Sequence, residues 1–228
     1  MIGATVKGRQ AMASLKLIIG NRTYSSWSLR PWLAMKANGL EFEEELIPLD
    51  TPQFKATIAG YGAAGRVPIL IDGEATVWDS LAIVEHLAER FPNGRHWWPR
   101  AGFLRAHARA AVAEMHSGFP RVRGNMPMNL RRTPAPLALD EATKDEIARI
   151  EHLWSEALRL SGGPFLYGDF SIADAFFAPV ATRFRSYAVP LGETAETYVR
   201  HIHDWPDFRA WHEAALKEPW HNSATDAI

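Results

Sequence analysis

Asp79 and Ser80 form the pair of residues in this sequence best suited to hold a small charged molecule. They stand at the start of a segment with apolar residues at helical spacing, so Ser80 supplies N-cap chemistry there. The first N–H groups of a helix bind carboxylates, because they have no partner within the helix and the helix dipole favours negative charge. Asp79 offers a negative charge to an ammonium group. The pair therefore suits a ligand that carries both charged groups of an α-amino acid at one end.

Pro68 stands at the head of a short apolar run, residues 67–71, that otherwise looks like a central strand. A central strand needs the N–H that proline lacks, and an X-Pro bond is the type of peptide bond whose cis form costs little. We expect a cis Val67–Pro68 bond that turns the N–H and C=O of Val67 outward. Such an open edge binds an extended peptide by strand addition. The alternative is a trans bond in an ordinary hairpin, with an ordinary helix start at Asp79.

The elements that position these residues are a predicted β-hairpin and the helix that follows it. Residues 67–71 and 75–78 are typical of two strands joined by an Asp-Gly turn. Apolar side chains then recur at helical spacing up to Phe91, and Pro92 ends the pattern. The Asp-Ser pair lies at the junction between the second strand and the helix.

This unit resembles the glutathione-binding half of the glutathione transferase family. The motifs that carry the resemblance are Gly65-Arg-Val-Pro and Trp78-Asp-Ser-Leu-Ala-Ile-Val-Glu-His-Leu. In that family the Val-Pro bond is cis and the acidic-Ser pair holds the γ-glutamyl end of glutathione. The resemblance implies that Val67 pairs its backbone with the cysteinyl part, that Asp79 meets the ammonium group and that Ser80 meets the neighbouring carboxylate. Arg66 either reaches the glycyl carboxylate or is a solvated loop charge.

A loop near the N-terminus carries four hydroxyl groups that can act on the sulfur of glutathione: Tyr24, Ser25, Ser26 and Ser28. A hydrogen bond from a hydroxyl and a nearby helix N-terminus both favour the thiolate, which is the nucleophile. The loop resembles the Ser-Ser-Cys-Ser loop of zeta-class transferases, which include maleylacetoacetate isomerases, and this implies Ser25 as the thiolate-stabilising residue with Ser26 beside it. Trp27 takes the family's Cys position and Leu29-Arg30 takes its Trp-Arg, and both departures weigh against an isomerase. The plainer alternative is that the serines only cap the helix.

The second substrate of such an enzyme is expected to lie against the helical half of the chain. We expect His116, Phe119 and Arg123 to line its pocket, near a non-periodic segment, residues 118–136, that is long for a connector. His116 also has a structural interpretation, as most single helical histidines do. His201 and His203 have no nearby third ligand, so we interpret them as surface residues and expect no metal site.

Length and composition fit one large domain or two small ones, in a protein of the cytoplasm. The chain has 228 residues, a formal net charge of −1 and no cysteine. The even charge balance argues against nucleic-acid binding, no apolar stretch has the length of a membrane span, and the first 13 residues do not form a secretory signal. Without cysteine the chain has neither disulfides nor a Cys nucleophile, so any sulfur chemistry must come from a bound thiol.

The N-terminal pattern predicts an α/β domain of the thioredoxin-like type. Strands are expected at residues 15–20 and 42–49, with a helix between them that stops at Asn38-Gly39 and a short helical turn before Gly60. Together with the hairpin and its helix, the order is β-α-β-(short α)-β-β-α, in which the first two strands are parallel and the last two antiparallel.

The pattern after residue 101 is all helical, as in the C-terminal bundle of the transferases. Helices are indicated around residues 104–115 and 140–162, a third starts at a capping box formed by Ser171 and Asp174, and a last one opens at Asp204. The predicted organisation is an extension at 1–13, a thioredoxin-like domain at 14–91, a linker at 92–101 and an all-helical domain at 102–228.

The sequence thus predicts a cytoplasmic, homodimeric glutathione transferase of the serine type that conjugates a small electrophile, as in detoxification. Glutathione is the expected co-substrate or cofactor, and no metal, membrane or nucleic acid is expected. Two alternatives remain. One is a glutathione-dependent isomerase of the maleylacetoacetate type, and the other is a glutathione-binding or scaffold protein without turnover, since fold alone does not fix function.

Overall fold

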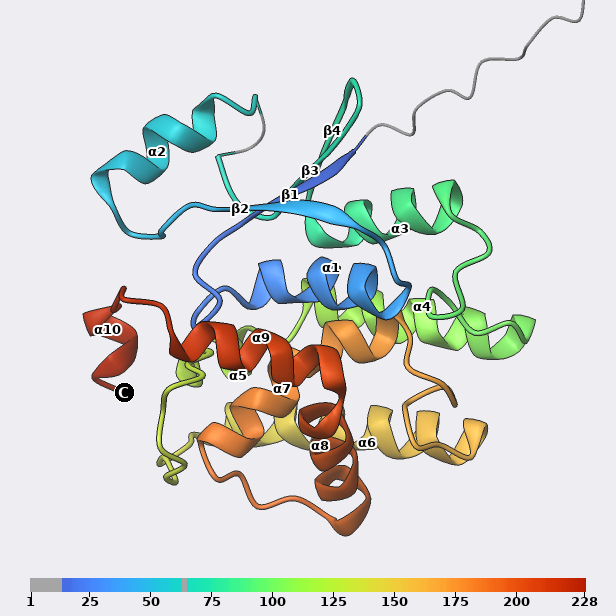
Figure 1. Ribbon diagram of the computed structural model, residues 1–228. Helices are drawn as coiled ribbons and strands as arrows, with labels where there is room; N and C mark the ends of the chain where they lie inside the picture. Colours follow the sequence, from blue (N-terminus) through green and yellow to red (C-terminus); the bar gives the residue numbers. More distant parts are fainter. Residues whose placement is uncertain (1–13, 63–64) are drawn as a thin grey trace, which may run out of the picture.

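The computed structural model describes residues 14–62 and 65–228, and the extension predicted at residues 1–13 lies outside that part. A four-stranded mixed sheet with its helices forms the N-terminal region, and helices alone form the C-terminal region (Figure 1). The predicted fold class is confirmed: a thioredoxin-like domain is followed by a helical domain. No helix or strand lies between residues 91 and 101, but the predicted domain limits stay predictions.

The sheet has the strand order β2-β1-β3-β4, with β1 and β2 parallel and the other pairs antiparallel. Its strands are β1 (Leu15–Ile19), β2 (Phe42–Leu46), β3 (Ile69–Asp72) and β4 (Ala75–Trp78). The apolar β1 is central and almost completely buried, whereas the acidic β2 lies at an edge, as its composition predicts. Lys16 on β1 forms ion pairs of 3.1 and 2.6 Å with Glu43 and Glu45 of β2. The second strand is shorter than the predicted residues 42–49.

Three helices cover the two faces of the sheet: α1 (Ser26–Ala37), α2 (Pro52–Ala59) and α3 (Ser80–Arg90). Both α1 and α3 lie between the sheet and the helical domain (Figure 1). The opposite face is covered by α2, whose Ile58 packs against Ile18, Ile47 and Ile69 in a small second core. The sequence predicted only a helical turn there, but Pro52 in the first turn and this apolar contact support a longer helix.

The helical domain is organised around α7, which is buried over almost its whole length. Its helices are α4 (Gly102–Ser117), α5 (Pro120–Asn125), α6 (Glu141–Ser161), α7 (Ile172–Ser186), α8 (Glu193–Asp204), α9 (Pro206–Leu216) and α10 (Ser223–Asp226). The helix predicted to be the last is α9, which α10 follows. Neither α5, α8 nor α10 was predicted. The first and last are too short for a periodic signal, but α8 has the spacing of an amphipathic helix, with Ala195, Tyr198, Val199 and Ile202 buried.

The N-terminus of α7 has the predicted capping box. Ser171 accepts a hydrogen bond from the N–H of Ala173, and the carboxylate of Asp174 accepts one from the N–H of Ser171. The same carboxylate also accepts hydrogen bonds from the Ser171 hydroxyl, the Leu166 N–H and the Tyr198 hydroxyl. Burial raises the pKa of Asp174 to about 6, against the effect of these donors. At neutral pH Asp174 is therefore an ionised, fully hydrogen-bonded group in the core.

His203 corrects the prediction that the two histidines of α8 are solvated surface residues. His203 is half-buried, and its Nδ1 lies 2.7 Å from the carbonyl oxygen of Val199. Burial lowers its pKa to about 4, with smaller contributions from nearby positive charge. His201 lies in the last turn of the same helix, and its Nδ1 is 2.9 Å from the carbonyl oxygen of Pro164.

We expect His203 to make the folded state less stable in acid. Its pKa is depressed in the folded state, so between about pH 6.5 and pH 4 the unfolded chain binds a proton that the folded chain does not. Stability contributed by the neutral imidazole is present above this window and is lost as the pH falls through it. From pH 7 to pH 5 the wild type should lose about 2 kcal/mol more than His203→Gln in urea unfolding. Equal losses in the two proteins would contradict this assignment.

Candidate functional site

A cavity of about 310 Å3 lies where the loop before β3 meets the end of β4 and the start of α3. Four of the predicted binding residues line it together: Arg66, Val67, Asp79 and Ser80. Trp27, Pro68 and Trp78 complete the lining. Its volume is in the range of small-molecule sites. We call it the Val67–Asp79 cavity.

Val67 has an open backbone edge in this cavity. The Val67–Pro68 peptide bond is cis, as expected from the sequence. Val67 precedes β3, and no described residue forms a hydrogen bond with its N–H or its C=O. Such a pair of free backbone groups can bind an extended peptide in the manner of an added strand.

The roles of Asp79 and Ser80 at the start of α3 differ from the prediction that Ser80 is the N-cap. Asp79, not Ser80, is the N-cap of α3: its carboxylate accepts hydrogen bonds from the N–H groups of Leu81 (2.8 Å) and Ala82 (3.3 Å). Its φ angle is +75° and its ψ angle is 132°; non-glycine residues are uncommon at positive φ, and Asp and Asn are enriched among them. Ser80 is the first residue of the helix, and its completely buried hydroxyl has no hydrogen-bond partner among the described residues. The cavity therefore offers an unpaired hydroxyl beside a half-exposed carboxylate.

The two predicted catalytic serines lie at the N-terminus of α1. Ser25 is the N-cap; its Oγ accepts a hydrogen bond from the Ser28 N–H and lies 2.8 Å from the Ser28 Oγ. Either hydroxyl can donate the hydrogen bond between them. When Ser28 is the donor, the hydroxyl proton of Ser25 is free for another acceptor. The Ser26 Oγ accepts a hydrogen bond of 3.3 Å from Arg183 Nη2, which leaves its own proton free. Both serines are buried, and Trp27 rather than either serine lines the cavity.

The hydroxyl of Tyr24 forms its hydrogen bonds with residues of the C-terminal segment. Its hydroxyl lies 2.8 and 3.0 Å from the two carboxylate oxygens of Asp226 and accepts a hydrogen bond from the N–H of Asn222. Burial and the Asp226 carboxylate raise its pKa. Of the four hydroxyls considered from the sequence, that of Tyr24 is therefore the one held by the C-terminal segment.

The residues predicted for the second substrate are only partly brought together. His116 on α4 contacts Trp27 edge to face, with 5.4 Å between ring centroids, and its Nε2 lies 3.2 Å from Asp79 Oδ2. Burial lowers the pKa of His116, so it is neutral at pH 7 and donates from Nε2, while its buried Nδ1 has no partner among the described residues. Arg123 on α5 lies 5.4 Å from the Trp27 ring. Phe119 is buried at the N-cap of α5 and contributes to the core.

Sequence reasoning missed Trp27 and Arg30 as parts of the site. Trp27 lines the cavity and connects the predicted serines to His116 and Arg123. Arg30 lies one turn further along α1, completely buried, with its Cζ 4.1 Å from the Trp27 ring. A signal for Arg30 did exist, because it stands among apolar residues on a helix that is apolar on most sides.

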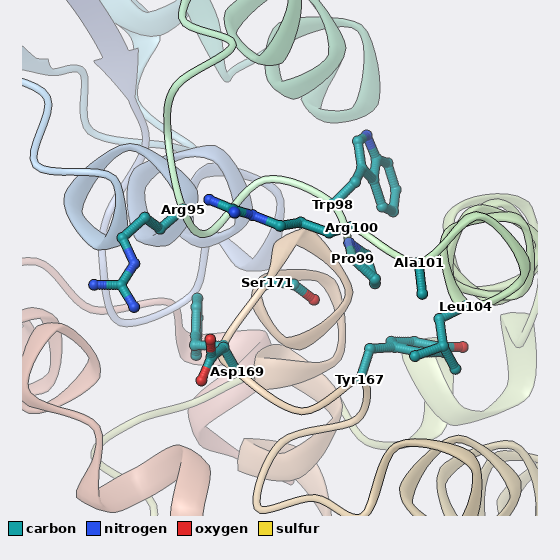
Figure 2. Close-up of a pocket in the computed structure, with 10 residues that line it drawn as sticks. Arg95, Trp98, Pro99, Arg100, Ala101, Leu104, Tyr167, Asp169 and Ser171 are labelled. Atoms are coloured by element: carbon teal, nitrogen blue, oxygen red, sulfur yellow. The ribbon is translucent and has the colours of Figure 1, made fainter.

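A second cavity, of about 460 Å3, lies at the connection between the two domains and contains none of the predicted residues (Figure 2). Arg95 and Arg100 from the connection, Tyr167, and Asp169 near the start of α7 line it. Both arginines are exposed. This cavity is separate in its lining from the Val67–Asp79 cavity.

Within residues 14–62 and 65–228, no helix is both long and apolar enough to cross a membrane. The same residues contain no group of three or more His, Asp or Glu side chains placed to hold a metal ion.

Two family models match the chain. Residues 24–90 match the model described as "Glutathione S-transferase, N-terminal domain", and residues 139–214 match "Glutathione S-transferase, C-terminal domain". Together the two models cover more than half of the chain, and the first includes every residue that lines the Val67–Asp79 cavity.

Known proteins with similar sequence or structure include three of interest. A dichloromethane dehalogenase of Methylophilus leisingeri is 39% identical over 69 residues, which are 28% of this chain and span only 25% of that protein. A glutathione transferase homologue from Burkholderia GL BGR1, solved with bound glutathione, has a TM-score of 0.68 at 22% identity and covers 90% of this chain and 99% of its own. A maleylacetoacetate isomerase from Anaeromyxobacter dehalogenans has a TM-score of 0.65 at 24% identity, covering 92% and 94%. At these identities the two structures are similar to this chain in fold.

Proposed function

Because the chain belongs to the glutathione S-transferase family, we propose that it binds glutathione in the Val67–Asp79 cavity and directs the thiolate at a small electrophile. The observation that carries the proposal is the set of unpaired groups in that cavity. Among the residues that the structure describes, none pairs with the backbone of Val67 or with the buried hydroxyl of Ser80. A buried polar group left unpaired costs about 1–3 kcal/mol, so a ligand that pairs it is favoured.

Each part of glutathione has a matching group. The γ-glutamyl carboxylate accepts hydrogen bonds from the hydroxyl and the N–H of Ser80, because the Asp79 side chain already caps the N–H groups of Leu81 and Ala82, and the dipole of α3 favours an anion there. The ammonium group pairs with the Asp79 carboxylate, which is half-exposed toward the cavity. The cysteinyl unit pairs with the backbone of Val67, and the glycyl carboxylate reaches Arg66.

The sulfur then points toward the N-terminus of α1. There the helix dipole and a hydroxyl of Ser25 or Ser26 stabilise the thiolate relative to the thiol. Ser26 accepts a hydrogen bond from the Arg183 guanidinium, and Ser25 from the Ser28 N–H. A hydroxyl that already accepts a hydrogen bond is a stronger donor, which favours both as thiolate partners.

Ser25→Ala should raise the pKa of the bound thiol by about 1–2 units, since a hydrogen bond to a charged group contributes about 1.5–3 kcal/mol. Glutathione affinity measured at low pH, where the sulfur is protonated, should change less than about threefold. The readout is the ultraviolet absorbance of the thiolate against pH. Tyr24→Phe serves as the matched variant and should leave the pKa unchanged, because Asp226 holds that hydroxyl. If the pKa of the bound thiol rises in Tyr24→Phe and not in Ser25→Ala, the assignment of Ser25 as the thiolate partner is wrong.

The wider assignment is a cytoplasmic homodimer with conjugating activity. Phe103 on α4 is 66% exposed, and because aromatic side chains are enriched in protein interfaces, it is the dimer contact that we propose. Light scattering of the wild type and of Phe103→Glu tests the assembly. Two dimer-sized proteins would count against a contact at Phe103.

An isomerase of the maleylacetoacetate type is the second candidate, favoured by the Ser25-Ser26 pair at the N-terminus of α1. Trp27 counts against it, because this bulky side chain stands beside the serines and fills space next to the cavity. Parallel assays of cis-trans isomerisation and chloronitrobenzene conjugation separate the two activities. Calorimetric binding of glutathione without turnover in either assay would favour a non-catalytic binding protein.

A further inference from the structure

Arg30 is a buried cation for which the described part of the chain supplies no hydrogen-bond acceptor. Its side chain has no exposed surface, and Nε, Nη1 and Nη2 all lack a partner among the described residues. Its Cζ lies 4.1 Å from the ring of Trp27 and 5.0 Å from the ring of Phe176. Such contacts stabilise the charge by about 2 kcal/mol when desolvated, but they engage the π-faces and leave the N–H groups unpaired. Arg30 therefore keeps an unused capacity to bind an oxyanion.

Two further guanidinium groups lie around the same indole and the serines beside it. Arg123 lies 5.4 Å from the Trp27 ring and donates one hydrogen bond, to the carbonyl oxygen of His116. Arg183 is buried and donates to Ser26 Oγ and to the carbonyl oxygens of Met126 and Pro179. Arg183 is thus satisfied, whereas Arg30 and Arg123 have donors to spare.

Carboxylates act on these positive charges only from beyond 4.0 Å in the described part of the chain: Asp79 on Arg30 and Glu146 on Arg123. The arginine ion pairs formed among residues 14–62 and 65–228 involve other arginines, so no carboxylate in this part lies within 4.0 Å of Arg30, Arg123 or Arg183. Burial and the neighbouring arginines lower the pKa of Arg30 to about 9, which still leaves it charged at neutral pH. The N-terminus of α1 adds the positive end of a helix dipole at the same place. The proposed glutathione thiolate neutralises one of these positive charges, and an excess of positive charge remains.

Trp27 is the residue that connects the cavity with Arg30. It lines the Val67–Asp79 cavity, and the Arg30 Cζ lies 4.1 Å from its ring. No described residue forms a hydrogen bond with the indole, so a change of its rotamer breaks only ring contacts. Neither Arg30 nor Arg123 lines the cavity with the indole in its present position.

We propose that the electrophile carries a carboxylate, which Arg123 and, once the Trp27 indole turns, Arg30 bind next to the glutathione sulfur. The proposal names the substrate class of the proposed transferase and rests on that function. A planar guanidinium matches a carboxylate through two parallel N–H···O bonds, which fixes orientation as well as affinity. The carboxylate supplies the acceptors that Arg30 lacks, and it places the reacting carbon of the electrophile toward the thiolate.

Calorimetric titration with two probes tests the proposal without any reaction. The probes are 3-nitrobenzoate and 3-nitrobenzamide, which have a similar shape but differ in charge, and neither has a leaving group. Each is titrated into the wild-type protein, with and without saturating glutathione. We expect the benzoate to bind at least tenfold more tightly than the amide. In Arg123→Gln and in Arg30→Met this ratio should fall to about one.

Arg121→Gln is the matched control, because Arg121 is an exposed residue on the same helix as Arg123. It should keep the wild-type ratio. Arg123 is only half-buried, so Arg123→Gln decides the question even where Arg30→Met does not fold. Equal affinities for the two probes in the wild type, or an unchanged ratio in Arg123→Gln, overturns the proposal. A different result would show that the proposed transferase function is wrong: titration with glutathione would give no heat, whatever the affinities for the two probes.

Discussion

Asp79→Asn is expected to weaken glutathione binding about 30-fold and to leave the fold intact. The carboxylate is the proposed partner of the γ-glutamyl ammonium, and losing a hydrogen bond to a charged group costs about 2 kcal/mol. Asn keeps an acceptor for the N–H groups of Leu81 and Ala82, so the cap of α3 survives. It also tolerates the positive φ of this position, where Ala would be strained. The measurement is the dissociation constant by calorimetry.

A glutathione analogue that lacks the amino group supplies the control for this variant. The wild type should lose about as much affinity for the analogue as Asp79→Asn loses for glutathione, and the variant should bind both ligands alike. The free energy of unfolding should change by less than about 1 kcal/mol. If the variant still distinguishes the two ligands as the wild type does, Asp79 does not meet the ammonium group.

Asp174→Ala is expected to destabilise the protein by about 4 kcal/mol, which lowers the thermal midpoint by about 10 °C. The Asp174 carboxylate is completely buried and accepts hydrogen bonds from Leu166, Ser171 and Tyr198. Removing it leaves these donors unpaired in the core and deletes half of the capping box of α7. Urea unfolding at pH 7.5, where Asp174 is ionised, measures the loss.

Two single-donor variants calibrate this effect. Ser171→Ala and Tyr198→Phe each remove a hydroxyl that donates to Asp174 and leave the carboxylate in place. Tyr198→Phe should cost about 1 kcal/mol, the usual contribution of one hydrogen bond, and Ser171→Ala about 2 kcal/mol, because it also loses the N-cap hydrogen bond from the Ala173 N–H. A loss in Asp174→Ala no larger than that in Ser171→Ala would mean that the carboxylate does not organise the start of α7.

The parts of the fold that the sequence predicted are those set by neighbours along the chain. The hairpin and the helix that begins after Asp79 follow from strand spacing, a turn signal and a cap within about 25 residues. The capping box of α7 is likewise a four-residue pattern. By contrast, α5 starts at a proline after Phe119 in a left-handed conformation, and its six residues give no period. Helix α8 was not predicted although its apolar residues have helical spacing, so in this case the sequence did contain the signal.

The convergence of the four proposed glutathione-binding residues was easier to predict than the surroundings of the proposed catalytic serines. Arg66, Val67, Asp79 and Ser80 lie on one local unit, so their convergence follows from the hairpin itself. The hydroxyls of Tyr24 and Ser26 depend on partners far along the chain, Asp226 and Arg183, which no spacing rule connects to them. The same distance in sequence hid the grouping of Arg30 with Arg123 around Trp27.

The most direct test of the account is the pKa of glutathione's thiol in complex with the wild-type protein. It is read from the ultraviolet absorbance of the thiolate between pH 5 and pH 10 at saturating protein. We expect a midpoint at least one unit below the value of about 8.5 for an ordinary thiol. A midpoint at that ordinary value, or spectra that do not differ from those of free glutathione at any pH, would contradict the proposal that this cavity binds and activates glutathione.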